Sequence, residues 1–148
     1  MYKNVLVAVD DSETSRCALR EAIAIARTSQ AKLHIVHVAD EVLLHMHQGT
    51  VVATQNLDNA MSAIRNAGKE ILDQAKAEAT DIEVDTILLE TARRRVSEVL
   101  VEKAKELGCY LIVIGRHGQR GLALFFLGSV AEQVAKLSDA SVLLVRKH

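Results

Sequence analysis

The strongest constraint on the fold is an alternation of short apolar runs with longer stretches of helical periodicity. The first run, Val5 to Val9, is rich in valine and ends in Asp-Asp-Ser-Glu, which is typical of a strand buried on both faces and followed by a polar turn. Strands separated by helical patterns of about ten or more residues indicate βαβ crossovers, and hence an α/β fold with helices on both faces of a parallel sheet. The pattern predicts strands at 5–9, 32–38, 82–89, 110–114 and 141–145, and helices at 14–28, 57–79, 96–107 and 129–137.

The length of 148 residues fits one domain, and no repeat, low-complexity tract or proline divides the chain. We therefore expect residues 1–148 to form a single unit. Ser12 is expected to cap the first helix, and Gly68, on the apolar face of the helix at 57–79, suggests close packing. Residues 40–56 form the one long irregular segment, for which a lid, a binding element or a mobile loop is expected.

Composition excludes several classes of protein. Apolar residues make up 49% of the chain, and 18 basic side chains face 19 acidic ones, so neither a disordered chain nor a nucleic-acid coat protein is expected. No apolar stretch approaches about 18 residues, and two cysteines cannot form a disulfide framework. The sequence therefore predicts a soluble cytoplasmic protein with neither nucleic acid nor membrane as a partner.

Two strand-to-helix loops stand out as places for chemistry, because ligands of open parallel sheets bind beyond the carboxyl ends of the strands. One loop is Val9-Asp10-Asp11-Ser12, and the other is the glycine loop, residues 115–121, which reads Gly-Arg-His-Gly-Gln-Arg-Gly. If their strands are neighbours, both loops face one crevice, and the strand order is 3-2-1-4-5. That order makes the last strand an edge of the sheet.

The glycine loop is suited to phosphate. Residues without Cβ let backbone N–H groups approach an anion, and Gly128-Ser129 then opens a helix whose N-terminal donors add to the same site. The loop is neither a Walker A motif nor a dinucleotide GxGxxG motif. The alternative is that these glycines merely turn the chain.

With these residues the sequence resembles the universal stress protein family, specifically its ATP-binding branch. The family motif is Gly, two residues, Gly, nine residues, then Gly-Ser or Gly-Thr, and it is complete here in Gly115, Gly118, Gly128 and Ser129. The resemblance runs along the whole chain, from the opening at 5–13 to the closing strand at 141–146.

The resemblance implies a site for ATP or AMP. Asp10 would lie near the ribose and phosphates and is a possible ligand of Mg²⁺ bound with ATP. The other implied contacts form two groups. The base and ribose side comprises Ala8, Val9, Val38, Ile114 and Gly115, and the phosphate side comprises Arg116, His117, Gly118, Gly128, Ser129 and Val130.

Two departures from the family pattern bear on this site. Ala131 stands where ATP-binding members often carry a hydroxyl residue, and the loop after the third strand reads Glu-Thr-Ala-Arg-Arg-Arg at 90–95. Arg93, Arg94 and Arg95 are interpreted as a solvated helix face, with a phosphate clamp or a surface for an acidic partner as the alternatives. His34 and His37 are three apart along a strand, so they are expected on opposite faces and cannot chelate one metal ion.

Three hypotheses follow for the function. The first is a nucleotide-binding sensor or regulator of the universal stress protein type. The second is a slow Mg-dependent ATP hydrolase or phosphotransferase, and the third is an interaction module that does not use nucleotide. The resemblance also implies a homodimer through the last strand, an apolar edge that invites pairing between subunits.

Overall fold

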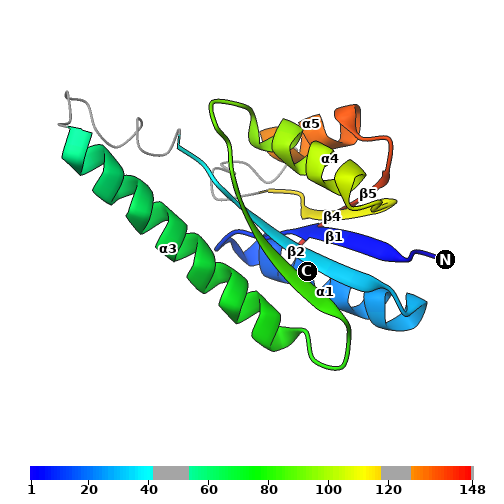
Figure 1. The fold of residues 1–148 in the computed structure, drawn as a ribbon. Helices are drawn as coiled ribbons and strands as arrows, with labels where there is room; N and C mark the ends of the chain where they lie inside the picture. Colours follow the sequence, from blue (N-terminus) through cyan, green and yellow to red (C-terminus); the bar gives the residue numbers. More distant parts are fainter. Residues whose placement is uncertain (42–53, 118–127, 148) are drawn as a thin grey trace.

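The computed structural model describes residues 1–41, 54–117 and 128–147, and side chains from residue 57 onward in the second range. Five strands and four helices alternate along the described chain (Figure 1). Their bounds are β1 (Asn4–Ala8), α1 (Glu13–Ser29), β2 (Lys32–Ala39), α3 (Thr54–Glu78), β3 (Val84–Glu90), α4 (Val96–Glu106), β4 (Leu111–Gly115), α5 (Ser129–Leu137) and β5 (Ser141–Val145).

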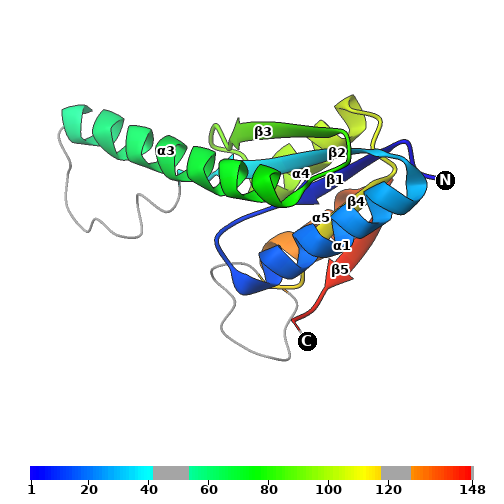
Figure 2. The ribbon, with the colours of Figure 1, turned by 90° about the horizontal axis from the view of Figure 1, so that it is seen from below.

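The strands form one parallel sheet in the order β3-β2-β1-β4-β5, which confirms the predicted α/β fold and strand order. Helices α1 and α3 cover one face, with α1 on β1, β4 and β5 and α3 on β2 and β3. Helices α4 and α5 cover the other face. Figure 2, seen from below, shows α1 crossing the sheet close to β5 while α3 runs beside β2 and β3.

The core has two layers because successive side chains of a strand point to opposite faces. On β1, Val5 and Val7 are buried against α1 and α3, whereas Leu6 is buried against α4 and α5. Gly68 of α3 is buried in the first layer, as its place on the apolar face predicted. A Cβ at Gly68 would lie 2.7 Å from Cδ2 of His37 and 2.8 Å from Cδ1 of Leu88, so the backbone of α3 approaches these side chains closely.

The largest differences between the predicted and the observed element bounds concern α3 and β3. Helix α3 begins at Thr54, so the last three residues of the segment expected to be irregular, 54–56, are helical. Strand β3 begins at Val84 because Asp81 adopts a left-handed backbone conformation (φ 63°), which extends the turn after α3. The rest of the segment, apart from Asp40 and Glu41, lies outside the described residues.

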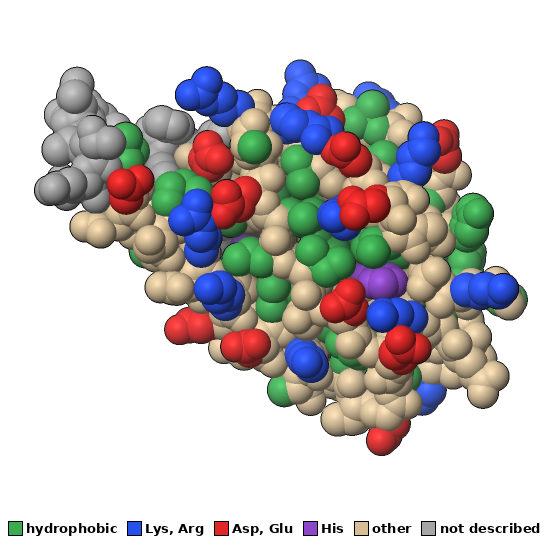
Figure 3. Space-filling model, in the orientation of Figure 1, with side chains coloured by type: hydrophobic (Ala, Val, Ile, Leu, Met, Phe, Trp, Pro, Cys, Tyr) green, Lys and Arg blue, Asp and Glu red, His purple; other side chains and the backbone are tan. Residues whose placement is uncertain are grey.

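The two sheet edges differ in character. Every residue of β3 from Val84 to Leu89 is partly buried. Figure 3, in the orientation of Figure 1, shows hydrophobic side chains gathered at the centre of the molecular face turned to the viewer, among charges of both signs. On β5, Ser141 and Leu143 are exposed while Val145 is buried. None of the helices in the described ranges is long and apolar enough to span a lipid bilayer.

Candidate nucleotide site

The two loops singled out in the sequence lie side by side. Strands β1 and β4 are hydrogen-bonded neighbours, and their last paired residues are Ala8 and Ile114. On one side of them the chain continues through β2 and β3, and on the other through β5, so the winding direction reverses between β1 and β4. The carboxyl ends of these strands therefore flank the point where ligands of open α/β sheets bind.

The loop after β1 is shaped by local hydrogen bonds. Ser12 caps α1, as predicted, because its Oγ accepts the N–H of Ser15 (3.2 Å). Asp10 Oδ1 accepts the N–H of Ser12 (2.8 Å), and the N–H of Asp10 donates to Ser15 Oγ (2.8 Å). These contacts hold the Asp10 carboxylate at the start of α1, where the helix dipole favours negative charge.

Gly115 is required by its contact with α1. A Cβ at this position would lie 3.0 Å from the carbonyl carbon of Thr14 and 3.2 Å from the backbone nitrogen of Ser15. The Thr14 hydroxyl donates a hydrogen bond to the carbonyl oxygen of His117 in the following loop. The end of β4 and the start of α1 are thus packed backbone to backbone.

The phosphate-side residues converge through backbone hydrogen bonds. The Arg116 N–H donates to the Val145 carbonyl oxygen (2.8 Å), and the Gly128 N–H donates to the Arg116 carbonyl oxygen (2.8 Å). The second bond brings the N-terminus of α5 to the end of β4. Ser129, the first residue of this helix, is exposed, and Val130 is partly buried. Gly118 lies outside the described residues.

Three of the side chains expected near the base share one layer. Ala8 and Val38 are partly buried against the α4/α5 core, to which Ile114 belongs. Val9 differs, because its side chain is buried in the α1/α3 layer. A cavity of about 50 Å³ between α1 and α3 reaches Asp10 and Asp11 on that side, which is far below the roughly 300 Å³ of a small-molecule pocket. The cavity on the α1/α3 side is therefore too small to hold a nucleotide.

The backbone polar groups of Val38 are oriented toward the β1 side of β2. Val36 accepts the N–H of Val9 (2.8 Å), so its peptide groups point toward β1, and those of Val38, two residues on, point the same way. Strand β1 pairs with β2 only as far as Ala8 and Val36, whereas β2 continues to Ala39. The N–H and C=O of Val38 therefore face the space past the end of β1.

The arginine run occupies the turn between β3 and α4. Ala92 and Arg93 have left-handed backbone conformations (φ 47° and 67°), and Arg95 is the N-cap of α4. Arg94 pairs with Glu102 of α4, and all three arginine side chains are exposed. The turn follows β3, which β2 separates from β1, and it leads into α4, which packs against α5.

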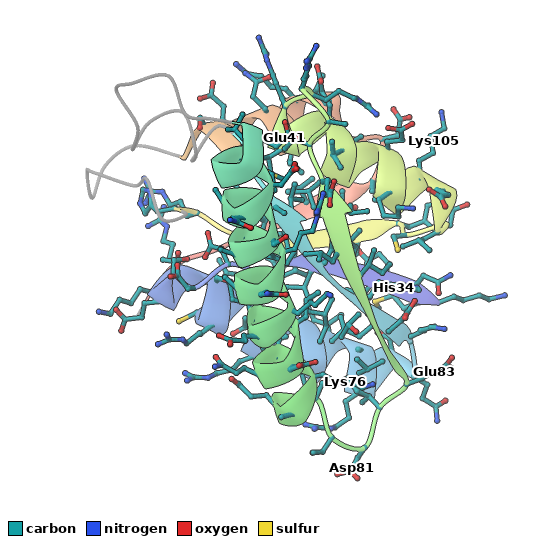
Figure 4. The ribbon with its side chains drawn as sticks, turned by 60° about the vertical axis from the view of Figure 1, so that its left-hand side comes forward. His34, Glu41, Lys76, Asp81, Glu83 and Lys105 are labelled. Carbon is teal, nitrogen blue, oxygen red and sulfur yellow. The ribbon has the colours of Figure 1, made fainter. Side chains whose placement is uncertain are left out.

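The two strand histidines lie on opposite faces of the sheet, as predicted. His34 is buried, with Nε2 3.3 Å from Asn4 Oδ1 and Nδ1 3.6 Å from Asp85 Oδ2. Burial lowers the pKa of His34, although the nearby Asp85 acts in the opposite direction. In Figure 4, His34 lies toward the turn marked by Asp81 and Glu83, whereas Glu41 lies near the far end of β3. His37 instead faces α3.

Three residues with a place in this arrangement were not predicted from the sequence. Thr14 links α1 to His117, Ser15 accepts the N–H of Asp10, and His37 Nδ1 lies 2.7 Å from the Val9 carbonyl oxygen. The signal available for His37 was Gly68, whose small size on the inner face of a long helix implies a bulky neighbour.

Comparison with known proteins agrees with this fold. The model of the universal stress protein family matches residues 1–146. "Universal stress protein YxiE" of Bacillus subtilis is 34% identical over 151 residues, covering 99% of this chain and 100% of that protein. Among solved structures, hypothetical protein MJ0577 has a TM-score of 0.84 at 27% identity, covering 100% of this chain and 98% of that one. A universal stress protein solved in complex with cAMP has a TM-score of 0.64 at 30% identity, covering 98% and 97%.

Proposed function

The chain belongs to the universal stress protein family, and we propose that it is an adenine-nucleotide-binding sensor or regulator of the stress response, of the ATP-binding branch. The observation that carries the proposal is the hydrogen bond from the Gly128 N–H to the Arg116 carbonyl oxygen (2.8 Å). It holds the N-terminus of α5 beside the switch point of the sheet. A helix N-terminus in that position favours a phosphate group.

In this proposal the phosphates of ATP or AMP lie at the start of α5. Their contacts are Arg116, His117, Gly118, Gly128, Ser129 and Val130, with donors from the backbone and from the Ser129 hydroxyl. Asp10 faces the ribose and, when ATP is bound with Mg²⁺, is the carboxylate available to the metal ion. Ala131 contributes no hydroxyl, because its side chain is a methyl group, and that methyl group is buried in the core behind the helix start.

The base lies over Ala8, Val38 and Ile114, beside the peptides of Val9 and Gly115. The Val38 N–H and C=O offer one donor and one acceptor along the strand. Adenine presents an acceptor at N1 next to a donor at N6, which complements this pair, whereas guanine, with its donor at N1 and its acceptor at O6, could complement it only with the base turned over. The site is therefore expected to prefer adenine, and the relative solved with cAMP supports the same ligand class.

Isothermal titration calorimetry tests the proposal with ATP, AMP, cyclic AMP, adenosine and GTP. Ser129→Asp is the informative variant, because a carboxylate at the first residue of α5 suits the helix dipole but repels phosphate. We expect this variant to bind ATP at least tenfold more weakly and adenosine nearly as well as the wild type does. Gln133→Glu adds the same charge one turn further along α5 and serves as the control. Equal ATP affinity in wild type and Ser129→Asp would contradict the phosphate assignment.

The remaining proposals concern turnover and assembly. Phosphate release from ATP in the presence of Mg²⁺, measured on the same preparation, tests the alternative of slow hydrolysis or phosphotransfer. A protein that binds no nucleotide would favour the interaction module.

We also propose that residues 1–148 act as one cytoplasmic domain, that two copies pair through β5, and that neither nucleic acid nor membrane is a partner.

A further inference from the structure

We propose that His37 is a positioning residue of the nucleotide site, fixing the peptide that carries Asp10 and connecting it to α3. The inference rests on the proposed function and adds to it a residue whose side chain is in the opposite layer from the proposed base contacts. Ala8, Val38 and Ile114 pack toward α4 and α5, whereas His37 packs toward α3. His37 therefore acts through the backbone of Val9 rather than on the nucleotide itself.

The peptide between Val9 and Asp10 is held at both of its polar groups. His37 Nδ1 lies 2.7 Å from the Val9 carbonyl oxygen, and the Asp10 N–H donates to Ser15 Oγ (2.8 Å). The preceding N–H, that of Val9, donates to Val36 (2.8 Å). With both groups bonded, the peptide cannot rotate without losing two hydrogen bonds. The direction in which Asp10 leaves β1 is thereby fixed.

The imidazole is itself held by its surroundings. A carbonyl oxygen only accepts hydrogen bonds, so Nδ1 carries the ring proton and donates a hydrogen bond to the Val9 carbonyl oxygen. On the other side, a Cβ at Gly68 would lie 2.7 Å from Cδ2 and 3.3 Å from Nε2 of the ring, so the backbone of α3 closes over it. Gly68 thus leaves room for the ring while restricting its movement away from Val9.

Through His37, helix α3 is connected to the nucleotide site, although no residue of α3 is among the proposed nucleotide contacts. The Asp10 carboxylate accepts the Ser12 N–H, and Gly115 packs against Thr14 and Ser15, so the fixed peptide also aligns the start of α1 with the end of β4. Loss of the bond from His37 would let the Val9–Asp10 peptide tilt. The cost would appear as weaker nucleotide binding, because the ligand would then have to order that peptide.

Two substitutions at His37 test the role. In His37→Asn, the side-chain amide nitrogen takes the place of Nδ1 and can still donate to Val9, whereas His37→Leu fills similar space without a donor. We expect calorimetry to show ATP binding about tenfold weaker in His37→Leu and within about threefold of wild type in His37→Asn. His34→Leu is the matched control, because His34 is on the same strand but contacts Asn4 at the start of β1. Its ATP affinity should be unchanged.

A second measurement keeps the test independent of folding. Gly68→Ala pushes the ring from the α3 side and should weaken ATP binding in the wild-type background but not in His37→Leu, where the bond is already absent. Far-ultraviolet circular dichroism and urea denaturation identify any variant that is not folded. Equal ATP affinity in folded His37→Leu and wild type, or equal losses in His37→Leu and His37→Asn, would overturn the positioning role alone. Wild-type protein that binds no adenine nucleotide would overturn the proposed function and this inference with it.

Discussion

The Thr14 hydroxyl donates a hydrogen bond to the carbonyl oxygen of His117, a residue 103 positions further along the chain. Thr14 lies in the first turn of α1, and His117 lies in the loop that follows β4. Because these segments follow β1 and β4 at the switch point of the sheet, the bond joins them into one structural unit. The unit also includes Ser12, whose Oγ lies 3.3 Å from the Thr14 hydroxyl.

Thr14→Val removes this bond while keeping the shape of the side chain. The His117 carbonyl loses its donor, so we expect the free energy of unfolding to fall by about 1 kcal/mol and nucleotide affinity to fall with it. Urea denaturation and calorimetry measure the two effects. Thr28→Val is the matched control, because the Thr28 hydroxyl donates to the carbonyl oxygen of Ala24 within the same helix and is exposed. Equal losses in the two variants would contradict the role given to Thr14.

Gly115→Ala should disturb the site through the backbone of α1. Its Cβ would lie 3.0 Å from the Thr14 carbonyl carbon, and backbone atoms at a helix start cannot move as a flexible side chain does. We expect a loss of about 1–3 kcal/mol in stability together with weaker nucleotide binding.

Gly108→Ala provides the comparison for that variant. Gly108 has a left-handed conformation (φ 63°) with open space around it, so alanine there costs about 1 kcal/mol through the backbone alone. Gly108 lies before the first residue of β4, at the amino ends of the strands, whereas the site lies at their carboxyl ends. ATP binding should therefore be unaffected. Unchanged ATP affinity in Gly115→Ala would show that the contact with α1 does not shape the site.

The pH dependence of the free energy of unfolding should reveal the lowered pKa of His34. Burial lowers its pKa in the folded protein, so below about pH 6.5 the unfolded chain binds more protons than the folded chain does. The free energy of unfolding should therefore fall as the pH drops below 6.5, by at most about 1.4 kcal/mol per pH unit for this one proton. Above that range both states are neutral at His34, and the group contributes no pH dependence.

His34→Leu isolates this contribution. Urea denaturation between pH 7.5 and 5 should show a smaller loss of stability in the variant than in the wild type, because the titrating group is absent. Asp85, Lys32 and Glu83 also influence His34, but they remain in both proteins. Parallel curves for the two proteins would exclude His34 as the source of the effect.

The fold could be predicted from the sequence almost completely, because its signals are local and repeated. The bounds predicted for the last helix and the last strand, 129–137 and 141–145, are those observed. Errors arose where a backbone conformation decides the end of an element. The left-handed conformation of Asp81 delays β3, and nothing in the residue type requires it.

The site could be predicted only in part, because its contacts join residues far apart in the sequence. The two conspicuous loops indicated the strand order. That order implies that the carboxyl ends of β1 and β4 are neighbours. Gly115 was expected on the base and ribose side of the site, and the sequence did not reveal that its missing side chain also makes room for α1. The bond from Thr14 to His117 and the contact of His37 with Gly68 depend on tertiary packing, which no local pattern specifies.

Pairing of two copies through β5 is the last prediction, and the structure indicates where to test it. The strand is the outermost of the sheet, and Leu143, 36% exposed, lines a shallow apolar groove with Tyr2, Ile25 and Leu111. Antiparallel pairing of two β5 edges about a twofold axis would cover both the open backbone groups and this groove. Leu143→Lys should therefore shift the sedimentation coefficient toward that of a monomer. Substitution of Val142 or Leu144 would also remove core packing, because both side chains pack against the α4/α5 layer. Ala67→Lys, on the exposed side of α3, adds the same charge far from β5 and should leave the dimer intact. A wild-type protein that sediments as a monomer at tens of micromolar would refute the pairing.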